Sequence, residues 1–151
     1  MSQALNLNTI LAQAGVKTDE ATGALTTPLH FSTTYQHPEF GQSTGYDYTR
    51  TKNPTRVSLE ETLAAIESAD YALATSSGMS AIVLAFSAFP VGSKVLAVRD
   101  LYGGSFRWFA QAEAEGRFVF TYANTEEELL NNLTEDIDIV YIETPTNPLM
   151  V

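Results

Sequence analysis

A run of small and hydroxyl-bearing residues, Thr75-Ser76-Ser77-Gly78-Met79, joins an apolar segment to the start of an expected helix. Backbone N–H groups converge at such a helix start, where the helix dipole favours an anion. The run could therefore hold a phosphate, although it carries no Walker lysine and the chain contains neither GxGxxG nor GxxxxGK[ST]. The alternative is that Ser76 and Ser77 only cap the helix.

A second candidate is the segment Asp100-Leu101-Tyr102-Gly103-Gly104, which follows the next apolar run along the chain. Two glycines after an aromatic residue leave one face of the Tyr102 ring open, so a planar ligand could stack on it. A tyrosine at an ordinary glycine turn is the alternative.

Two further segments combine charged and polar side chains with rigid or aromatic neighbours. Gly45-Tyr46-Asp47-Tyr48-Thr49-Arg50 contains an arginine, whose planar fork suits phosphate or carboxylate; otherwise Arg50 is a solvated surface charge. Glu143-Thr144-Pro145-Thr146-Asn147-Pro148 contains two prolines, which predict a stiff loop that aims Glu143 and Asn147 across the strand ends. The alternative is a proline-rich turn.

These segments must be positioned by the regular elements between them. Short apolar runs rich in β-branched and aromatic residues predict buried strands at 71–75, 95–98, 118–122 and 137–142. Helices are expected at 79–89, about 104–115, and 126–133, where Thr125 and Glu128 have capping-box spacing. This alternation predicts an α/β fold with a parallel sheet. The loops at 76–79, 99–104, 123–125 and 143–148 would then share the carboxyl edge, where ligands bind.

Residues 1–53 show little periodicity, which is unusual for a compact domain and indicates an arm that becomes ordered on a partner. Asn53-Pro54-Thr55 then predicts the start of a helix. We therefore divide the chain into an arm, residues 1–53, and an α/β domain that begins at residue 54 and is incomplete at residue 151.

Composition excludes several classes of function. The formal net charge of −10 would repel a nucleic-acid backbone. The absence of cysteine removes disulfides, thiolate nucleophiles and cysteine metal sites. The two histidines, His30 and His37, show no ligand spacing, so no metal site is expected and structural roles are favoured for both.

Residues 71–93 carry no charge and are long enough to span a bilayer, but their glycines, proline and serines favour a strand, a turn and a helix. No charged segment precedes an apolar stretch at the amino terminus, because the first charged side chain is Lys17. These features favour a cytoplasmic location.

Four motifs in a fixed order resemble one family. GYDYTRTKNPTRVSLEETLAAIES, ATSSGMSA, RDLYGGS and IETPTNPL occur in that order in the Cys/Met-metabolism (transsulfuration) enzymes that use pyridoxal 5′-phosphate (PLP), and TGALTTPLHFSTTY is similar to their N-terminal segment. The resemblance runs from about residue 8 to residue 151. It implies the large domain of the aspartate-aminotransferase type (PLP fold type I), preceded by an arm.

The resemblance also implies roles for the residues of the first two segments. The backbone of Gly78 and Met79, with Ser77, would hold the cofactor phosphate. Tyr102 would stack on the pyridine ring and take part in proton transfer, which makes it the catalytic residue expected in this chain.

The other two segments receive roles in the same way. Tyr48 and Arg50 would reach the phosphate of a neighbouring subunit's cofactor, Asn147 would lie near the phenolic oxygen, and Glu143 would support the site. A homotetramer built from dimers with shared sites is implied, which gives the arm a partner.

Two departures from the family pattern matter. The lysine that binds the cofactor and the aspartate that pairs with the pyridine nitrogen have no match here, because Lys17, Lys52 and Lys94 fit no such motif. The 151-residue chain alone is therefore expected to be inactive. Methionine γ-lyases place cysteine two residues after the stacking tyrosine, where this chain has Gly104.

The resemblance implies carbon–sulfur chemistry on sulfur amino acids, of the cystathionine β-lyase or cystathionine γ-synthase type, with γ-lyase chemistry as an alternative. The substrates would be cystathionine, or activated homoserine plus cysteine. A rival interpretation is a flavodoxin-like or nucleotide-binding module complete at 151 residues, which binds a phosphate ligand without catalysis. A third is a non-catalytic fragment that only assembles.

Overall fold

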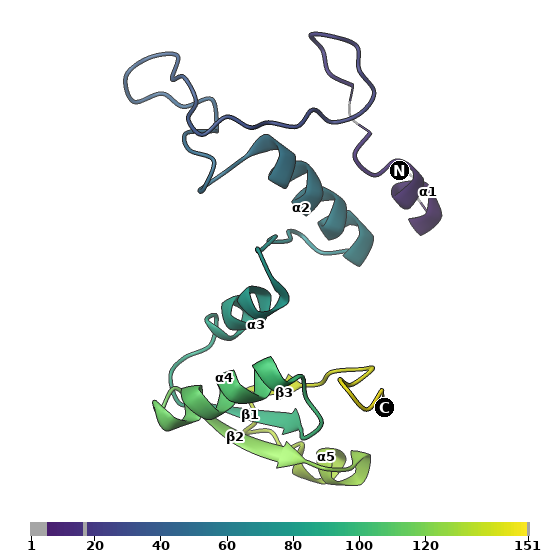
Figure 1. Cartoon of the computed structure of the whole chain (residues 1–151), viewed down its shortest axis with the longest axis vertical. Coiled ribbons are helices and arrows are strands. Elements are labelled where there is room, and N and C mark those ends of the chain that lie inside the picture. Colours follow the sequence, from purple (N-terminus) through teal and green to yellow (C-terminus); the bar gives the residue numbers. More distant parts are fainter. Residues whose placement is uncertain (1–5, 17, 151) are drawn as a thin grey trace. The chain divides into compact units, whose positions relative to one another are not determined.

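A computed structural model describes residues 6–16 and 18–150 of the chain. The chain divides into two compact units, the N-terminal unit (residues 1–74) and the C-terminal unit (residues 75–151) (Figure 1). The N-terminal unit contains α1 (Leu7–Ala12) and α2 (Pro54–Glu67). The C-terminal unit contains, in order, α3 (Gly78–Phe86), β1 (Ser93–Val98), α4 (Gly103–Ala114), β2 (Phe118–Ala123), α5 (Glu126–Asn132) and β3 (Ile139–Tyr141).

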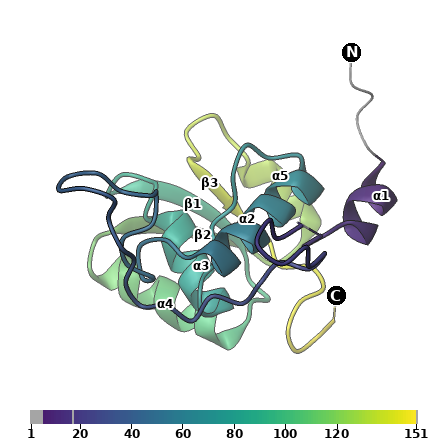
Figure 2. The ribbon, with the colours of Figure 1, turned by 90° about the horizontal axis from the view of Figure 1, so that it is seen from above.

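The described strands of the C-terminal unit form a parallel sheet in the order β2-β1-β3. β1 is central, and its Val95 is aligned with Phe120 of β2 and with Ile139 of β3. α4 covers one face of the sheet and α5 lies toward the other (Figures 1 and 2). The predicted α/β alternation is confirmed, and the carboxyl ends of the three strands share one edge.

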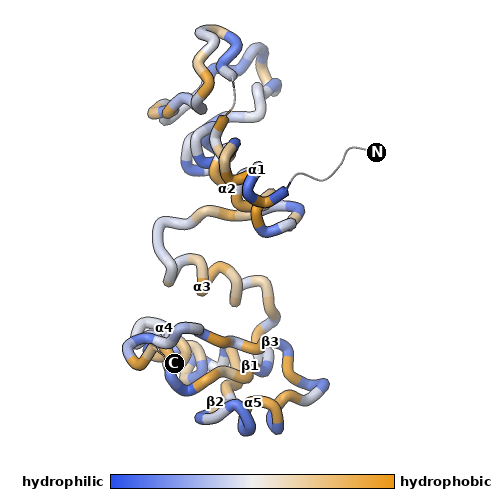
Figure 3. Tube along the Cα trace, turned by 90° about the vertical axis from the view of Figure 1, so that its right-hand side faces the viewer, coloured by the Kyte–Doolittle hydropathy of each residue, from blue (hydrophilic) through white to orange (hydrophobic). Residues whose placement is uncertain are grey.

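Aromatic rings form the core between the sheet and the helices α3 and α4. The Phe86 ring of α3 lies 5.1 Å from Trp108 and 5.3 Å from Phe118, measured between centroids. Phe109 of α4 stacks on Phe120 of β2 at 4.6 Å and is fully buried. The apolar segments are orange in Figure 3. The buried cluster consists of Phe86, Val95, Ala97, Leu101, Phe109, Ala112, Phe118 and Phe120.

Capping residues start the helices where the sequence predicts them. Asn53 Oδ1 accepts hydrogen bonds from the N–H groups of Thr55 and Arg56, at 2.9 and 3.3 Å, and Pro54 occupies the first turn of α2. At α5, Thr125 Oγ1 accepts from the Glu128 N–H at 3.1 Å. The Glu128 carboxylate completes the cap one residue earlier than a capping box would, by accepting from the N–H of Asn124 at 2.7 Å.

The strand predicted at 71–75 is wrong, because these residues have no regular secondary structure. A strand requires a hydrogen-bonded neighbour, and no described residue pairs with this segment as a strand. Its Ala74 N–H instead donates to the Glu60 carboxylate of α2 at 3.0 Å. The sheet formed by the described residues therefore has three strands instead of the four expected.

The uncharged stretch 71–93 is divided between irregular chain, the nine residues of α3 and the start of β1. In the part of the chain that the structure describes, no helix has the length and apolar character needed to cross a membrane.

Candidate functional site

The turn after β1 places the Tyr102 ring directly against backbone. Tyr102 is the residue before α4, and its side chain is 45% exposed. A Cβ built on Gly104 would stand 3.0 Å from Tyr102 Cδ1, closer still to Cε1, and 3.2 Å from Met79 Sδ. Only glycine fits at position 104 without displacing these atoms, so the glycine of this turn has a packing basis.

The Glu143 carboxylate, which follows β3, ties this turn to the neighbouring strand end. Its Oε2 accepts from the Tyr102 N–H at 2.7 Å, and its Oε1 accepts from Ser105 Oγ at 2.7 Å and from the Tyr141 hydroxyl at 2.8 Å. Ser105 is fully buried. The predicted proximity of the loops after β1 and β3 is thus present, and Ser105 and Tyr141 join them.

Hydrogen bonds control the ionisation of this cluster. Burial raises the pKa of Glu143, but the three donors stabilise the carboxylate and hold its pKa below its ordinary value. Burial raises the pKa of Tyr141, so its hydroxyl keeps the proton that it donates. Glu143 is therefore an anionic acceptor at neutral pH.

The Ser77-Gly78-Met79 turn forms the start of α3. Ser77 Oγ accepts from the Ser80 N–H at 3.1 Å, so Ser77 is a helix cap. The N–H groups of Gly78 and Met79 belong to the first turn, which has no intrahelical acceptors for them. A Cβ on Gly78 would meet no atom within 4 Å, so the space around this helix start is open.

Packing on α4 and on the Gly104 turn positions α3, whereas the sequence predicted that a strand of the sheet would position it. The sequence placed residues 76–79 at the sheet edge through a strand at 71–75, and that strand is absent. Instead, Phe86 and Trp108 pack α3 on α4, and Met79 Sδ reaches the Tyr102 turn.

The remaining residues at this edge are less constrained. Asn147 is exposed, and its side chain makes no hydrogen bond to another described residue. Asp100, at the end of β1, has a buried Oδ2 that finds no hydrogen-bond partner among the described residues. Sequence reasoning had noted Asp100 only as the first residue of the Tyr102 segment.

Tyr48 and Arg50 lie in the N-terminal unit, in a hairpin-like pairing with residues 33–35. The Tyr35 N–H donates to Asp47 O at 3.2 Å, and the Thr49 N–H donates to Thr33 O at 2.9 Å. Arg50 Nη2 donates to the Tyr48 hydroxyl at 3.3 Å. The guanidinium is exposed and forms no ion pair with a described carboxylate.

Two residues that sequence reasoning did not assign to the site hold this hairpin on α2. Asn53 Nδ2 donates to Thr49 Oγ1 at 2.6 Å and to His30 O at 3.1 Å. Arg56 Nη2 donates to Thr51 O at 2.8 Å, and its Nη1 donates to Thr49 O at 3.2 Å. The spacing of Asn53 and Arg56 around Pro54 was visible, but it indicated only a helix start.

Of the three lysines, one lies in the C-terminal unit, one in the N-terminal unit and one outside the described residues. Lys94 lies near the beginning of β1, at the opposite end of the strand from Tyr102, and forms an ion pair with Asp136. Lys52, in the N-terminal unit, lies over the Tyr46 ring at 5.3 Å. Lys17 lies outside the described residues.

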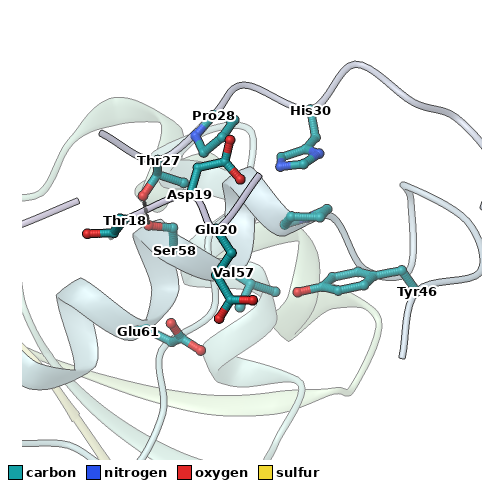
Figure 4. A pocket seen from close by; sticks show the side chains of 11 residues that line it. Thr18, Asp19, Glu20, Thr27, Pro28, His30, Tyr46, Val57, Ser58 and Glu61 are labelled. Atoms are coloured by element: carbon teal, nitrogen blue, oxygen red, sulfur yellow. Dashed lines mark hydrogen bonds between the residues drawn. The ribbon is translucent and has the colours of Figure 1, made fainter. Parts of the chain in front are cut away.

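A separate pocket of about 400 Å³ opens in the N-terminal unit, beside the start of α2 (Figure 4). Thr27 and Ser58 join its walls through a hydrogen bond of 3.3 Å. No lysine or arginine is among its described lining residues, so a phosphate is disfavoured there. The lining residues are Thr18, Asp19, Glu20, Thr27, Pro28, His30, Tyr46, Pro54, Val57, Ser58 and Glu61.

Comparisons of the sequence and of the structure with known proteins lead to the same family. The model of the Cys/Met metabolism PLP-dependent enzyme family matches residues 8–151. A cystathionine gamma-synthase of Haemophilus influenzae is 44% identical over 156 residues, which cover 99% of this chain and 42% of the relative. A cystathionine gamma-synthase/O-acetylhomoserine (thiol)-lyase of Bacillus subtilis is 42% identical over 152 residues, which cover 99% of this chain and 40% of the relative.

A solved structure extends the likeness to three dimensions. The crystal structure of cystathionine gamma synthase from Xanthomonas oryzae pv. oryzae in complex with aminoacrylate and cysteine superimposes with a TM-score of 0.88 at 36% identity. The match covers 98% of this chain and 39% of that structure, so the chain spans about two fifths of the length of these relatives. The chain belongs to the Cys/Met metabolism PLP-dependent enzyme family.

Proposed function

We propose that the complete gene product is a PLP-dependent transsulfuration enzyme of the cystathionine γ-synthase type, which joins cysteine to an activated homoserine. The synthase names of the relatives described above support this choice. The cysteine in the Xanthomonas oryzae complex indicates the substrate class. Cystathionine β-lyase or γ-lyase chemistry is the alternative, because such lyases also match this chain.

The packing of Tyr102, Gly104 and Met79 is the observation that carries the proposal. It places the partly exposed Tyr102 ring at a glycine turn that Met79 also approaches, and Met79 lies at the start of a helix whose Gly78 N–H has no intrahelical acceptor. An aromatic ring with a phosphate attached requires this combination of a stacking surface and an anion site. The described residues therefore fit PLP without any change of side chain.

Within this proposal each segment has a defined task. The backbone of Gly78 and Met79, with the Ser77 hydroxyl, binds the phosphate, and Tyr102 stacks on the pyridine ring. Bound PLP supplies an electron sink that stabilises negative charge on the substrate carbon beside the amino group. The Tyr102 hydroxyl moves a proton at the substrate, and the exposed Asn147 amide donates to the phenolic oxygen.

The N-terminal residues complete the site of a second copy. We propose that residues 1–53 act as an arm, that Tyr48 and Arg50 bind the phosphate held by a neighbouring subunit, and that residues 54–151 form the first part of the cofactor domain. The exposed guanidinium of Arg50, without a carboxylate partner among the described residues, supports this role. Dimers with shared sites would pair into a homotetramer.

We expect no carbon–sulfur lyase activity from the 151-residue chain alone, because Lys17, Lys52 and Lys94 fit no motif for covalent binding of the cofactor. Lys94 is at the opposite end of β1 and is paired with Asp136. The purified chain is mixed with PLP, reduced with borohydride and mapped by mass spectrometry. A stoichiometric adduct on Lys52 or Lys94, with thiol release from cystathionine, would contradict this expectation.

The complete gene product tests the proposal directly. It is loaded with PLP and supplied with cysteine and an activated homoserine, and cystathionine is measured by mass spectrometry. In parallel, cystathionine is supplied, and the products of β-cleavage (homocysteine, pyruvate and ammonia) and of γ-cleavage (cysteine, 2-oxobutyrate and ammonia) are measured. We expect faster cystathionine formation than cleavage. Faster cleavage would favour the lyase alternative, and no cofactor absorbance with no turnover in either assay would exclude the proposed function.

Tyr102 variants separate stacking from proton transfer in the same assays. Tyr102→Phe keeps the ring and loses the hydroxyl, so it should retain PLP while turnover falls. Tyr102→Ala should lose both cofactor retention and turnover. Equal and negligible effects of the two variants would contradict both roles.

A further inference from the structure

Groups of the same chain occupy most of the hydrogen-bond acceptor positions of the Glu143 carboxylate. Its two oxygens accept three hydrogen bonds of 2.7 to 2.8 Å, from a backbone N–H and two hydroxyl groups. An ionised carboxylate offers about four acceptor positions, so at most one remains for a ligand. This geometry agrees with the supporting role that the resemblance implies for Glu143.

The three donors come from elements that must meet for the site to exist. The Tyr102 N–H and the Ser105 hydroxyl belong to the turn and first helical residues after β1, whereas the Tyr141 hydroxyl belongs to β3. Glu143 therefore fixes the loop after β1 to the end of β3. The hydrogen bond from the Tyr102 N–H to the Glu143 carboxylate is charge-assisted, and it holds the backbone of the residue that carries the ring.

The hydrogen bond to Glu143 fixes the backbone of Tyr102 and so limits the positions that its ring can take. With that N–H fixed, the Tyr102 ring lies beside Gly104, which Met79 Sδ also approaches. Tyr102 has no side-chain cap to α4 that would do the same work. We propose that Glu143, together with Ser105 and Tyr141, is a positioning residue that fixes the Tyr102 turn before the cofactor binds; this inference rests on the proposed function.

The chain supplies a matched control at the same sheet edge. Glu128 also accepts from a backbone N–H, that of Asn124, at 2.7 Å, and from the Asn124 side-chain amide at 2.8 Å. Asn124 follows β2 as Tyr102 follows β1, but no residue of the proposed cofactor site takes part. A general stabilising effect would appear in both carboxylates, whereas a positioning effect on Tyr102 requires Glu143.

The first test needs no cofactor. Hydrogen exchange of the Tyr102 amide is measured in the complete gene product without PLP, with the amide of the buried Leu96 in β1 as an internal reference. Glu143→Ala should speed exchange at Tyr102 about tenfold or more while Leu96 is unchanged, because a charge-assisted bond is lost locally. Glu128→Ala should leave the Tyr102 amide unaffected.

Conservative variants keep the test decisive if Glu143→Ala fails to fold. In Glu143→Gln the amide oxygen can still accept from the Tyr102 N–H. The amide NH₂ group can donate to the Ser105 and Tyr141 hydroxyls, which can rotate to accept. This variant should change Tyr102 exchange by less than about threefold. Ser105→Ala removes one donor with little change of volume and should raise exchange about threefold. Unchanged exchange in both Ser105→Ala and Glu143→Ala would overturn the proposal.

Cofactor binding is the second measurement. Glu143→Ala should weaken PLP about tenfold and shift its absorbance band, Glu143→Gln should rescue both, and Glu128→Ala should match the wild type. If exchange at Tyr102 rises but PLP affinity does not fall, the positioning role is excluded while the proposed function stands. If the wild type binds no PLP, the proposed function fails, and the exchange result alone still reports the Glu143 contact.

Discussion

The two units of this chain reach order by different means. The C-terminal unit buries a contiguous cluster of apolar side chains from α3, α4 and the sheet. In the described part of the N-terminal unit, Ala64 is the one apolar residue that is buried, whereas Leu29, Phe31 and Phe40 are 70%, 90% and 107% exposed. Its long loops are held by polar contacts around Asn53 and Arg56.

The difference indicates where each unit obtains its stability. Apolar burial in the C-terminal unit is a driving force that needs no second molecule. The N-terminal unit leaves large apolar side chains in water, and polar bonds alone contribute modestly because water competes for the same groups. This contrast agrees with the proposal that residues 1–53 become fully ordered on a neighbouring subunit.

The largest expected effect would come from removing the centre of the aromatic core. Phe109→Ala should lower the unfolding free energy of the C-terminal unit by about 3–5 kcal/mol, because it leaves a cavity between the sheet and α4. Urea unfolding followed by fluorescence of Trp108, the single tryptophan, measures it. Phe31→Ala should change the midpoint very little. A comparable loss in both variants would break the distinction between the units.

A methyl group at Gly104 tests how closely the C-terminal unit is packed at its edge. Gly104→Ala should lower the unfolding free energy by about 1–3 kcal/mol, because the new Cβ overlaps the Tyr102 ring. Gly103→Ala is the control, since its Cβ would stand at an ordinary 3.4 Å from Arg107 Nη1. Equal stability of the two variants in urea unfolding would show that the ring moves aside freely.

Loss of the polar anchor tests the N-terminal unit. Asn53→Ala removes the cap of α2 and two donors to the hairpin, so the unit should lose about 1–2 kcal/mol. Hydrogen exchange at the Thr49 and Thr55 amides measures it. Asn53→Asp keeps the cap but not the donors, and should protect Thr55 better than Thr49. Loss of protection spread evenly over both amides would contradict separate roles.

Acid titration should give the smallest effect. The Lys94 ammonium beside Asp136 lowers the pKa of that carboxyl from 3.8 to about 2 in the folded chain. A lowered folded pKa contributes stability above pH 3.8, and this contribution is lost as the pH falls toward 2. Both side chains are exposed, so the loss should be slight.

Asp136→Asn should remove that part of the pH dependence between pH 4 and 2, as measured by urea unfolding at a series of pH values. In the N-terminal unit, the Thr22 hydroxyl lowers the pKa of Asp19. NMR titration of both carboxyls follows the two units separately. A midpoint for Asp136 at or above 3.8 would contradict the ion pair.

Local signals predicted α2 to α5 and three strands because they act over a few residues, whereas the short helix α1 (Leu7–Ala12) was not predicted in the arm. Asn53 before Pro54, and Thr125 before Glu128, fix helix starts through short bonds that the sequence displays. The segment 71–75 has the composition of a buried strand, but composition does not supply a partner strand, and no described residue does so. A β-strand forms only when its backbone groups bond to a neighbouring strand, which explains why the strand predicted at 71–75 is absent.

The sequence predicted which segments form the candidate site, but not all the side-chain contacts that join them. Packing of α3 on α4 brings Met79 to the glycine turn that follows Tyr102. The roles of Tyr102, Ser77, Gly78 and Met79 toward a ligand stay predictions. Ser105 and Tyr141 gave no signal, because a serine in a helix and a tyrosine in a strand are ordinary residues there. Their role depends on a carboxylate 38 and 2 positions away, respectively.

The close approach at Gly104 also restricts how this sequence can change over evolutionary time. A side chain at position 104 overlaps Tyr102 and presses on Met79, so it is accepted only after one of those residues has shifted or been replaced. Substitutions at these three positions are therefore epistatic, and their order matters. A descendant that acquires a larger residue at position 104 therefore needs a compensating change at Tyr102 or Met79.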